Sequence, residues 1–258
     1  MTASLPEIVP GNNVLQSLLF LRDRFSVQLD YESILRTGYS RFVHEGDVVV
    51  DIGANEGMHT GALLRLVGPT GRLIAFEPIP AMAEILRNKF AAGYPNCEIN
   101  ELAISGDSGM TTFALAEGVP TESGIRQRKQ SAATSFREIT VRTEPLSHYI
   151  SRLPRLDYVK VDVEGADIGA IRSGESDIRR LRPIISMEYG FAGYSVYGHE
   201  QRSLWDLAAS LDYRLFTLFG QPLLELSGWM SVCDLVIWDW YLVPAEKADT
   251  FPKVVAGL

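Results

Sequence analysis

The sequence predicts a doubly wound α/β fold built on a mostly parallel sheet, and three observations support that prediction. Residues 48–57 begin with three valines that read as a strand buried on both faces, and a glycine-containing loop follows at once. Met58 to Val67 then has the apolar spacing of a helix. Finally, four predicted strands end in an acidic residue, namely Asp51, Glu77, Asp162 and Glu188. Since the carboxyl ends of parallel strands meet at one crevice, we expect a ligand site there.

The loop after the first strand favours one class of ligand over another. A dinucleotide site would have glycine at the middle position of Gly-x-Gly-x-x-Gly, whereas this loop has Asn55 between Gly53 and Gly57. The acid at its start, Asp51, suits a cationic ligand better than a pyrophosphate. S-adenosylmethionine (SAM) carries a sulfonium and an ammonium that Asp51 would face, while loop amides approach its carboxylate. The loop therefore favours SAM, with a nicotinamide dinucleotide as the alternative.

Composition limits the classes of partner. With 24 basic and 32 acidic residues in 258, the net charge is −8 and no Lys/Arg cluster is apparent, which argues against nucleic acid and anionic membranes as main partners. The apolar stretch 14–21 is too short for a membrane span and no basic segment precedes it. Cys97 and Cys233 belong to no metal or redox motif, so free thiols in a reducing cytoplasm are expected.

The first half of the chain supplies the elements around this loop. Helices are predicted over residues 14–24 and 31–42, as a lid or side layer over the ligand edge. A strand over 72–77, a helix over 81–92 entered through Pro80 and a strand over 96–103 follow. Glu77 stands at close to the spacing from Asp51 at which a βαβ unit places an acid on a ribose diol. Residues 101–105 are expected to form part of an adenine pocket.

Residues 110–116 and 135–143 alternate polar with apolar residues and predict an antiparallel pair inserted into the fold. The polar segment between them, 117–134, is either functional or mobile. It carries Arg126 and Arg128, which either hold an anionic substrate or form a solvated charge cluster. A helix over 145–152 leads back to the main sheet.

The second informative stretch is 156–165, Leu-Asp-Tyr-Val-Lys-Val-Asp-Val-Glu-Gly. Strand parity puts Lys160, Asp162 and Glu164 on one face and the valines on the other. A lysine within so apolar a strand needs a carboxylate partner, and Asp162 is the nearest candidate on the same face. This pair is either purely structural or part of the ligand crevice.

The remaining elements complete an α/β pattern. A helix over 166–180 breaks at Gly174, and a strand over 182–189 ends at Glu188. The glycine- and aromatic-rich segment 190–199 is expected to form a wall or lid at the same edge. A helix over 201–211 precedes strands over 213–219 and 232–238, which suit an antiparallel edge on a parallel sheet.

Three motifs in this order resemble the FkbM family of SAM-dependent methyltransferases: residues 50–57 (VDIGANEG), 76–80 (FEPIP) with Asn88 downstream, and 159–165 (VKVDVEG). The likeness covers about residues 47–189. It implies a class I methyltransferase (Rossmann-like) fold with a seven-stranded mostly parallel sheet, one antiparallel strand and helices on both faces. It also implies O-methylation of sugars, polyketides or other secondary metabolites, with SAM as cofactor.

Carried onto this chain, the resemblance implies a cofactor site made of the first motif, the second motif and nearby positions. Its members are Asp51, Gly53, Ala54, Asn55, Gly57, His59, Thr60, Glu77, Pro78, Ala103 and Asp162. We divide the chain into an N-terminal helical segment (1–45), a SAM-binding domain (46–243) with a β insertion around 110–143, and a C-terminal tail (244–258).

Methyl transfer to a hydroxyl needs a base for its proton. The candidates are Asp162, Glu188, His199 and Glu164, in that order. Asp162 and Glu188 together would also suit a divalent cation, but no His/Asp spacing demands one, so no metal is expected. The partner is expected to be a small hydroxylated molecule, and a homo-oligomer is possible. The alternatives are an NAD(P)-dependent oxidoreductase and a non-catalytic SAM-fold binding protein.

Overall fold

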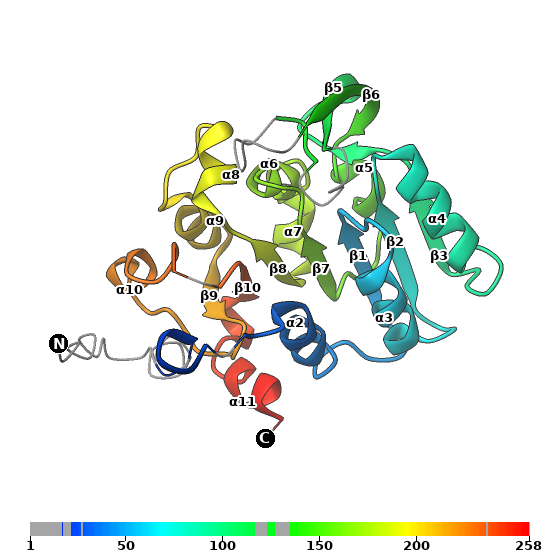
Figure 1. Cartoon of the computed structure of the whole chain (residues 1–258). Helices are drawn as coiled ribbons and strands as arrows, with labels where there is room; N and C mark the ends of the chain where they lie inside the picture. Colours follow the sequence, from blue (N-terminus) through cyan, green and yellow to red (C-terminus); the bar gives the residue numbers. More distant parts are fainter. Residues whose placement is uncertain are drawn as a thin grey trace.

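A seven-stranded sheet with strand order β3-β2-β1-β7-β8-β10-β9 forms the centre of the computed structural model (Figure 1). The structure describes residue 17 and residues 22–26, 28–116, 123–126, 135–235 and 237–257. The strands of this sheet are β1 (Val48–Ile52), β2 (Arg72–Phe76), β3 (Cys97–Asn100), β7 (Tyr158–Val161), β8 (Ile184–Glu188), β9 (Tyr213–Thr217) and β10 (Asp239–Pro244).

The sheet has one antiparallel strand, as predicted. Strands β3, β2, β1, β7 and β8 pair in parallel, and β10 runs antiparallel to both β8 and β9. The prediction of a last strand over 232–238 was wrong: residues 232–234 form turns after α10, and β10 begins at Asp239. The run 240–243 is buried throughout, and it takes an interior place between β8 and β9 rather than the edge.

Helices cover both faces of the sheet, with α2, α3 and α11 on one side and α6 and α9 on the other (Figure 1). The predicted helix over 14–24 lies mostly outside the described residues. The predicted break at Gly174 is confirmed, because this residue lies between α6 and α7. No helix in the described ranges is both long and apolar enough to cross a bilayer. The helices are α2 (Tyr31–Tyr39), α3 (Met58–Val67), α4 (Pro80–Phe90), α5 (Ser147–Ile150), α6 (Asp167–Arg172), α7 (Glu175–Leu181), α8 (Phe191–Val196), α9 (Ser203–Leu211), α10 (Leu226–Met230), η2 (Ala245–Lys247) and α11 (Phe251–Ala256).

A second, three-stranded sheet has the order β4-β6-β5. Its strands are β4 (Ala103–Ile104), β5 (Gly109–Ala116) and β6 (Phe136–Glu144), and the β5–β6 pairing is antiparallel, as predicted. The expected single strand over 96–103 is corrected here. Strand β3 ends at Asn100, and Ala103 leaves the main sheet to pair in parallel with β6. Most of the loop between β5 and β6, including Arg128, lies outside the described residues.

Helix α2 lies directly against the sheet. A Cβ on Gly38 would overlap the phenol oxygen of Tyr241 on β10, so glycine permits this close approach. The rings of Tyr39 and Tyr158 lie 5.6 Å apart, and Phe42 packs edge-on against both Tyr158 and Tyr241. Helix α2 is thus docked on β7 and β10.

The loop after β1 is pressed against the end of β7. Gly53 has φ +83, and a Cβ there would overlap the carbonyl oxygen of Asp162. The amides of Gly53 and Ala54 both donate to the carbonyl of Phe76 at 3.0 Å. The ends of β1, β2 and β7 therefore converge, and only glycine fits at the point of contact.

We expect Gly53→Ala to lower the free energy of unfolding by about 2–4 kcal/mol, because the new methyl group adds backbone strain to a steric overlap. Urea unfolding followed by circular dichroism measures this. Gly93→Ala is the matched control, since a Cβ at Gly93 meets nothing within 4 Å, and it should change stability by less than about 0.5 kcal/mol. Equal effects of the two substitutions would contradict the packing argument.

Candidate active site at the carboxyl edge of the sheet

Glu77 joins the loops that follow β1 and β2. Its carboxylate accepts hydrogen bonds from the amide of Asn55 at 2.8 Å and from the amide of Ile79 at 2.7 Å. The side chain is buried, and burial raises the pKa of Glu77 to about 7 although the two amide bonds act in the opposite direction. Both carboxylate oxygens are thereby oriented, and the carboxyl group titrates near neutral pH.

Glu77 lines a cavity of about 240 Å³ at the carboxyl edge of the sheet. Of the predicted cofactor residues, Gly53, Asn55, Glu77, Pro78, Ala103 and Asp162 line it. Its apolar wall includes Ile52, Phe76, Ile79, Leu102 and Ile104. Residues 102–104 lie where an adenine pocket was predicted.

The other predicted cofactor residues support this loop without lining the cavity. They are Asp51, Ala54, Gly57, His59 and Thr60. Asp51 accepts a hydrogen bond from the Thr60 hydroxyl at 2.7 Å, and its second oxygen, Oδ1, is buried with no hydrogen-bond partner in the described chain. Gly57 caps α3 with φ +86. Asp51 thus places a negative charge under the loop.

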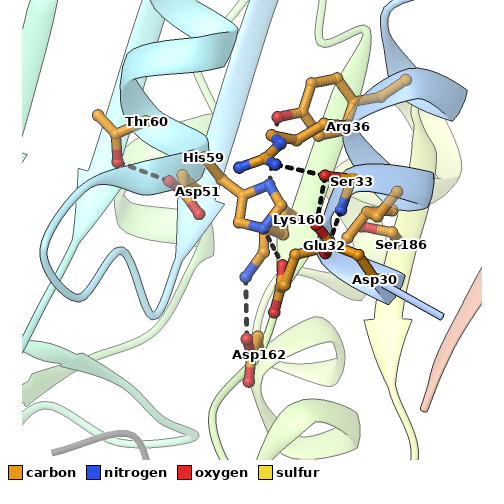
Figure 2. A network of polar contacts seen from close by, with 12 residues as sticks. Asp30, Glu32, Ser33, Arg36, Asp51, His59, Thr60, Lys160, Asp162 and Ser186 are labelled. Carbon is orange, nitrogen blue, oxygen red and sulfur yellow. Dashed lines mark hydrogen bonds and ion pairs between the residues drawn. The ribbon is translucent and has the colours of Figure 1, made fainter. Parts of the chain in front are cut away.

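Lys160 is buried within β7, only 3% exposed, and its ammonium lies 3.1 Å from Asp162 at the cavity edge (Figure 2). Burial alone would lower the pKa of Lys160, but Asp162, Asp51 and Asp239 raise it more, and the net shift is upward. Burial likewise disfavours the charged form of Asp162, yet Lys160 lowers the pKa of that carboxyl. The predicted ion pair is confirmed, and both members are charged at neutral pH.

His59 connects α3 to α2 rather than reaching the cavity. Its Nε2 lies 2.5 Å from a carboxylate oxygen of Glu32 (Figure 2). Its Nδ1 lies 3.1 Å from the Tyr39 hydroxyl. Because a carboxylate only accepts, Nε2 carries the proton in this pair. The hydrogen bond from His59 lowers the pKa of Glu32, which therefore stands ionised at the cavity wall.

Three of the four predicted catalytic residues gather at one point. Asp162, Glu164 and Glu188 each place a carboxylate oxygen within 4.8 Å of the others, and all three line the cavity. The fourth, His199, lines neither cavity and packs beside the ring of Tyr194 at 5.8 Å. Burial and the nearby Arg172 and Arg126 lower the pKa of His199.

Arg126 also turns away from the crevice. Its guanidinium donates to the carbonyl of Val196 at 2.8 Å and lies over the ring of Tyr197 at 5.1 Å. It therefore ties the β insertion to α8.

A second cavity, of about 340 Å³, adjoins the first. The two share Glu32, Asp162 and Glu188. Five carboxyl groups line it, and no lysine, arginine or histidine of the described chain does. Its lining consists of Leu29, Asp30, Tyr31, Glu32, Asp162, Glu188, Trp238 and Asp239.

Several site residues escaped the sequence-based reasoning. Glu32 comes from α2, and Phe113, Ser123 and Ile125 come from the β insertion. Asp239 pairs with Glu188 across the antiparallel β8–β10 ladder, so it begins a strand at the same edge where the parallel strands end. The only signal for it was an acid directly before the apolar run 240–243.

The sheet order, the single antiparallel strand and a crevice at the carboxyl ends define the class I methyltransferase fold. A family model described as the methyltransferase FkbM domain matches residues 51–215. The chain therefore belongs to the FkbM family of SAM-dependent methyltransferases.

Other methyltransferases are more distantly similar. A protein-L-isoaspartate O-methyltransferase of Methanococcus aeolicus is 25% identical over 128 residues, which are 49% of this chain and 58% of that protein. Another, of Ignicoccus hospitalis, is 36% identical over 58 residues, 22% of this chain and 28% of that protein. The chain thus spans less than two thirds of the length of these curated relatives. Ribosomal RNA large subunit methyltransferase E of Marinobacter nauticus is 23% identical over 181 residues, 66% of this chain and 87% of that one.

Among solved structures, an FkbM methyltransferase of Methylobacillus flagellatus aligns with 90% of this chain and 60% of its own, at 12% identity and a TM-score of 0.48. Fibrillarin of Aeropyrum pernix, solved with natively bound SAM, aligns with 83% of this chain and 76% of its own, at 13% identity and a TM-score of 0.45.

Burial of Asp239 makes stability depend on pH. The side chain is 9% exposed, and burial raises the pKa of Asp239 to about 7. Because the folded protein then binds a proton that the unfolded chain has lost, this group's contribution to stability falls as pH rises from about 4 towards 7. Asp239→Asn removes that effect. The stability advantage of the variant should grow by about 2–3 kcal/mol from pH 5 to pH 8.

Urea unfolding at a series of pH values measures this difference. Asp249→Asn is the control, since Asp249 is exposed and outside both cavities, and it should show no such trend. A difference between Asp239→Asn and the parent protein that stays constant from pH 5 to pH 8 would contradict the argument.

Proposed function

We propose that the protein transfers a methyl group from SAM to a hydroxyl group of a small molecule. The observation that carries this proposal is the junction of the two cavities at Glu32, Asp162 and Glu188. The first cavity contains Glu77, the oriented acid after β2, and the second cavity adjoins it. A methyl donor and an acceptor would meet at their shared carboxylates.

The first cavity fits SAM by its donor set. Glu77 is held by two amides with its carboxylate in the cavity wall, as a ribose diol requires. Gly53 lines the cavity, and the carboxyl group of Asp51 lies under the loop with its buried Oδ1 free of any hydrogen-bond partner in the described chain. We assign Gly53, Asn55, Glu77 and Pro78 to the methionine and ribose parts, and Leu102 and Ala103 to the adenine. SAM supplies the activated methyl group and a neutral sulfide as leaving group.

We assign the base to Asp162, with Glu188 as second candidate. Lys160 keeps Asp162 ionised although other carboxylates surround it, so Asp162 is ready to accept a proton. The hydroxyl oxygen of the acceptor gains the methyl group, and its proton passes to the Asp162 carboxylate. Orientation of the acceptor by the neighbouring carboxylates would supply a large share of the acceleration. His199 has no place in this assignment.

A small acceptor fits the charge of the chain better than the alternatives do. The named relatives include protein and ribosomal RNA methyltransferases, but a net charge of −8 and an acidic second cavity disfavour RNA. The family match disfavours a nicotinamide-dependent oxidoreductase. The free Cys97 and Cys233 are consistent with a reducing cytoplasm.

We propose that residues 46–243 form the catalytic unit, with 1–45 as a side layer that contributes Glu32 and 244–258 as a tail. Gly38 and the aromatic contacts of α2 support this division, since they hold the side layer against the sheet. A non-catalytic SAM-binding protein is the remaining alternative. A measurement of methyl-transfer turnover distinguishes it from an enzyme.

Glu77→Gln should weaken SAM binding about tenfold or more, because a ribose hydroxyl loses a charged acceptor. Isothermal titration at pH 8, where the carboxyl is ionised, measures the dissociation constant. Glu84→Gln, on the exposed side of α4, is the control and should leave it unchanged. Unchanged SAM affinity in Glu77→Gln would mean that the ribose is held elsewhere.

Asp162→Asn should lower kcat by about 10²–10⁴-fold, the usual contribution of a general base, while the SAM dissociation constant changes less than about threefold. Transfer of labelled methyl from SAM to a panel of hydroxylated metabolites measures turnover, and titration measures binding. If instead the variant unfolds more easily and keeps its turnover when folded, the Lys160–Asp162 pair is structural only.

A further inference from the structure

The second cavity is more acidic than the methyl donor requires. Asp162 is paired with Lys160, and Glu32 accepts a hydrogen bond from His59. Asp30 accepts two hydrogen bonds from Ser33 at the start of α2, and its carboxylate forms part of the wall of the second cavity. SAM carries a single net positive charge. Glu77 already lines the cavity assigned to SAM, and Asp51 lies under the loop beside it. The remaining acidic side chains line the second cavity.

Asp239 is the clearest case. The residue is nine-tenths buried and lines the second cavity, and its carboxyl group forms no hydrogen bond or ion pair within the described part of the chain. Lys160 attracts the Asp239 carboxylate through space, but the ion pair of Lys160 is with Asp162. A buried carboxylate that receives no hydrogen bond is unfavourable, so Asp239 gains from a ligand that donates to it and carries a positive charge. This observation is independent of the number of acids around it.

An aromatic wall completes the arrangement. Trp238 precedes Asp239, lines the same cavity and is 52% exposed, while Tyr31 lines it from α2. An indole face attracts ammonium groups more strongly than other aromatic side chains do. Carboxylates beside an accessible indole are therefore a chemically specific environment for a protonated amine.

We propose that the second cavity binds the acceptor, and that this acceptor carries a protonated amine in addition to the hydroxyl that is methylated. Asp239, Asp30 and Trp238 bind the amine, and Asp162 faces the hydroxyl. The proposal rests on the proposed methyl transfer and adds the substrate class. It also explains why α2 is part of the site, since Asp30 and Glu32 come from its start.

A divalent cation is the competing ligand for these carboxylates, because Asp162, Glu164 and Glu188 place oxygens within 4.8 Å of one another. A neutral polyol is the competing acceptor. Both are distinguishable outcomes of one experiment.

The full chain is assayed at pH 7.5 with labelled SAM and matched probes: glucosamine, galactosamine, ethanolamine and serinol, each beside its N-acetylated form. The free amines should show kcat/KM values about tenfold or more above the acetylated forms, the usual effect of one hydrogen bond to a charged group. Asp239→Asn should raise KM for the amines about tenfold and leave both kcat and the SAM dissociation constant unchanged. Asp249→Asn, exposed and outside the cavities, is the control.

Equal use of acetylated and free probes would overturn the proposal, and so would no transfer to any probe by a protein that binds SAM. Loss of activity in EDTA with recovery in Mg²⁺, together with no preference for amines, would assign the carboxylates to a metal ion. Failure to bind SAM would instead count against the proposed function itself, and titration reports this separately.

Discussion

The buried charge of Lys160 is the constraint on which the rest of the crevice depends. An ammonium group 3% exposed in the middle of a sheet is stable only if carboxylates surround it. Asp51 on β1 lies opposite Lys160 in the strand register, Asp162 directly follows the end of β7, and Asp239 begins β10 nearby. The strand order that places β1, β7, β8 and β10 side by side is therefore also the arrangement that compensates this charge.

The charge of Lys160 also makes the pKa values of the neighbouring acids differ. Lys160 keeps Asp162 ionised, whereas burial leaves Glu77 and Asp239 with pKa values near 7. Asp162 is therefore unprotonated at neutral pH, whereas Glu77 and Asp239 titrate close to it. The acids of this one crevice differ in protonation because each is buried and paired differently.

The N-terminal helix α2 is as much a part of the site as the matched domain. The family model begins at residue 51, yet Glu32 lines both cavities and is held by His59 from α3. Gly38 and the aromatic contacts of Tyr39 dock α2 on β7 and β10. The second cavity is therefore lined both by residues of the matched domain, Asp162 and Glu188, and by segments outside it, residues 29–32 and 238–239.

The sequence by itself determined the parallel core, the turn at Gly53, the position of Glu77 directly after β2 and the Lys160–Asp162 pair. Each of these depends on neighbouring residues along the chain: apolar runs, a glycine turn, an acid at a strand end and strand parity. Only the tertiary structure decided that β10 starts at Asp239 and lies inside the sheet, that Ala103 joins a second sheet, and that His199 lies outside the crevice. Only it brought in Glu32 from α2, and Phe113 and Ile125 from the insertion. These placements depend on contacts between segments far apart in the chain, and their energies leave no periodic pattern in either segment alone.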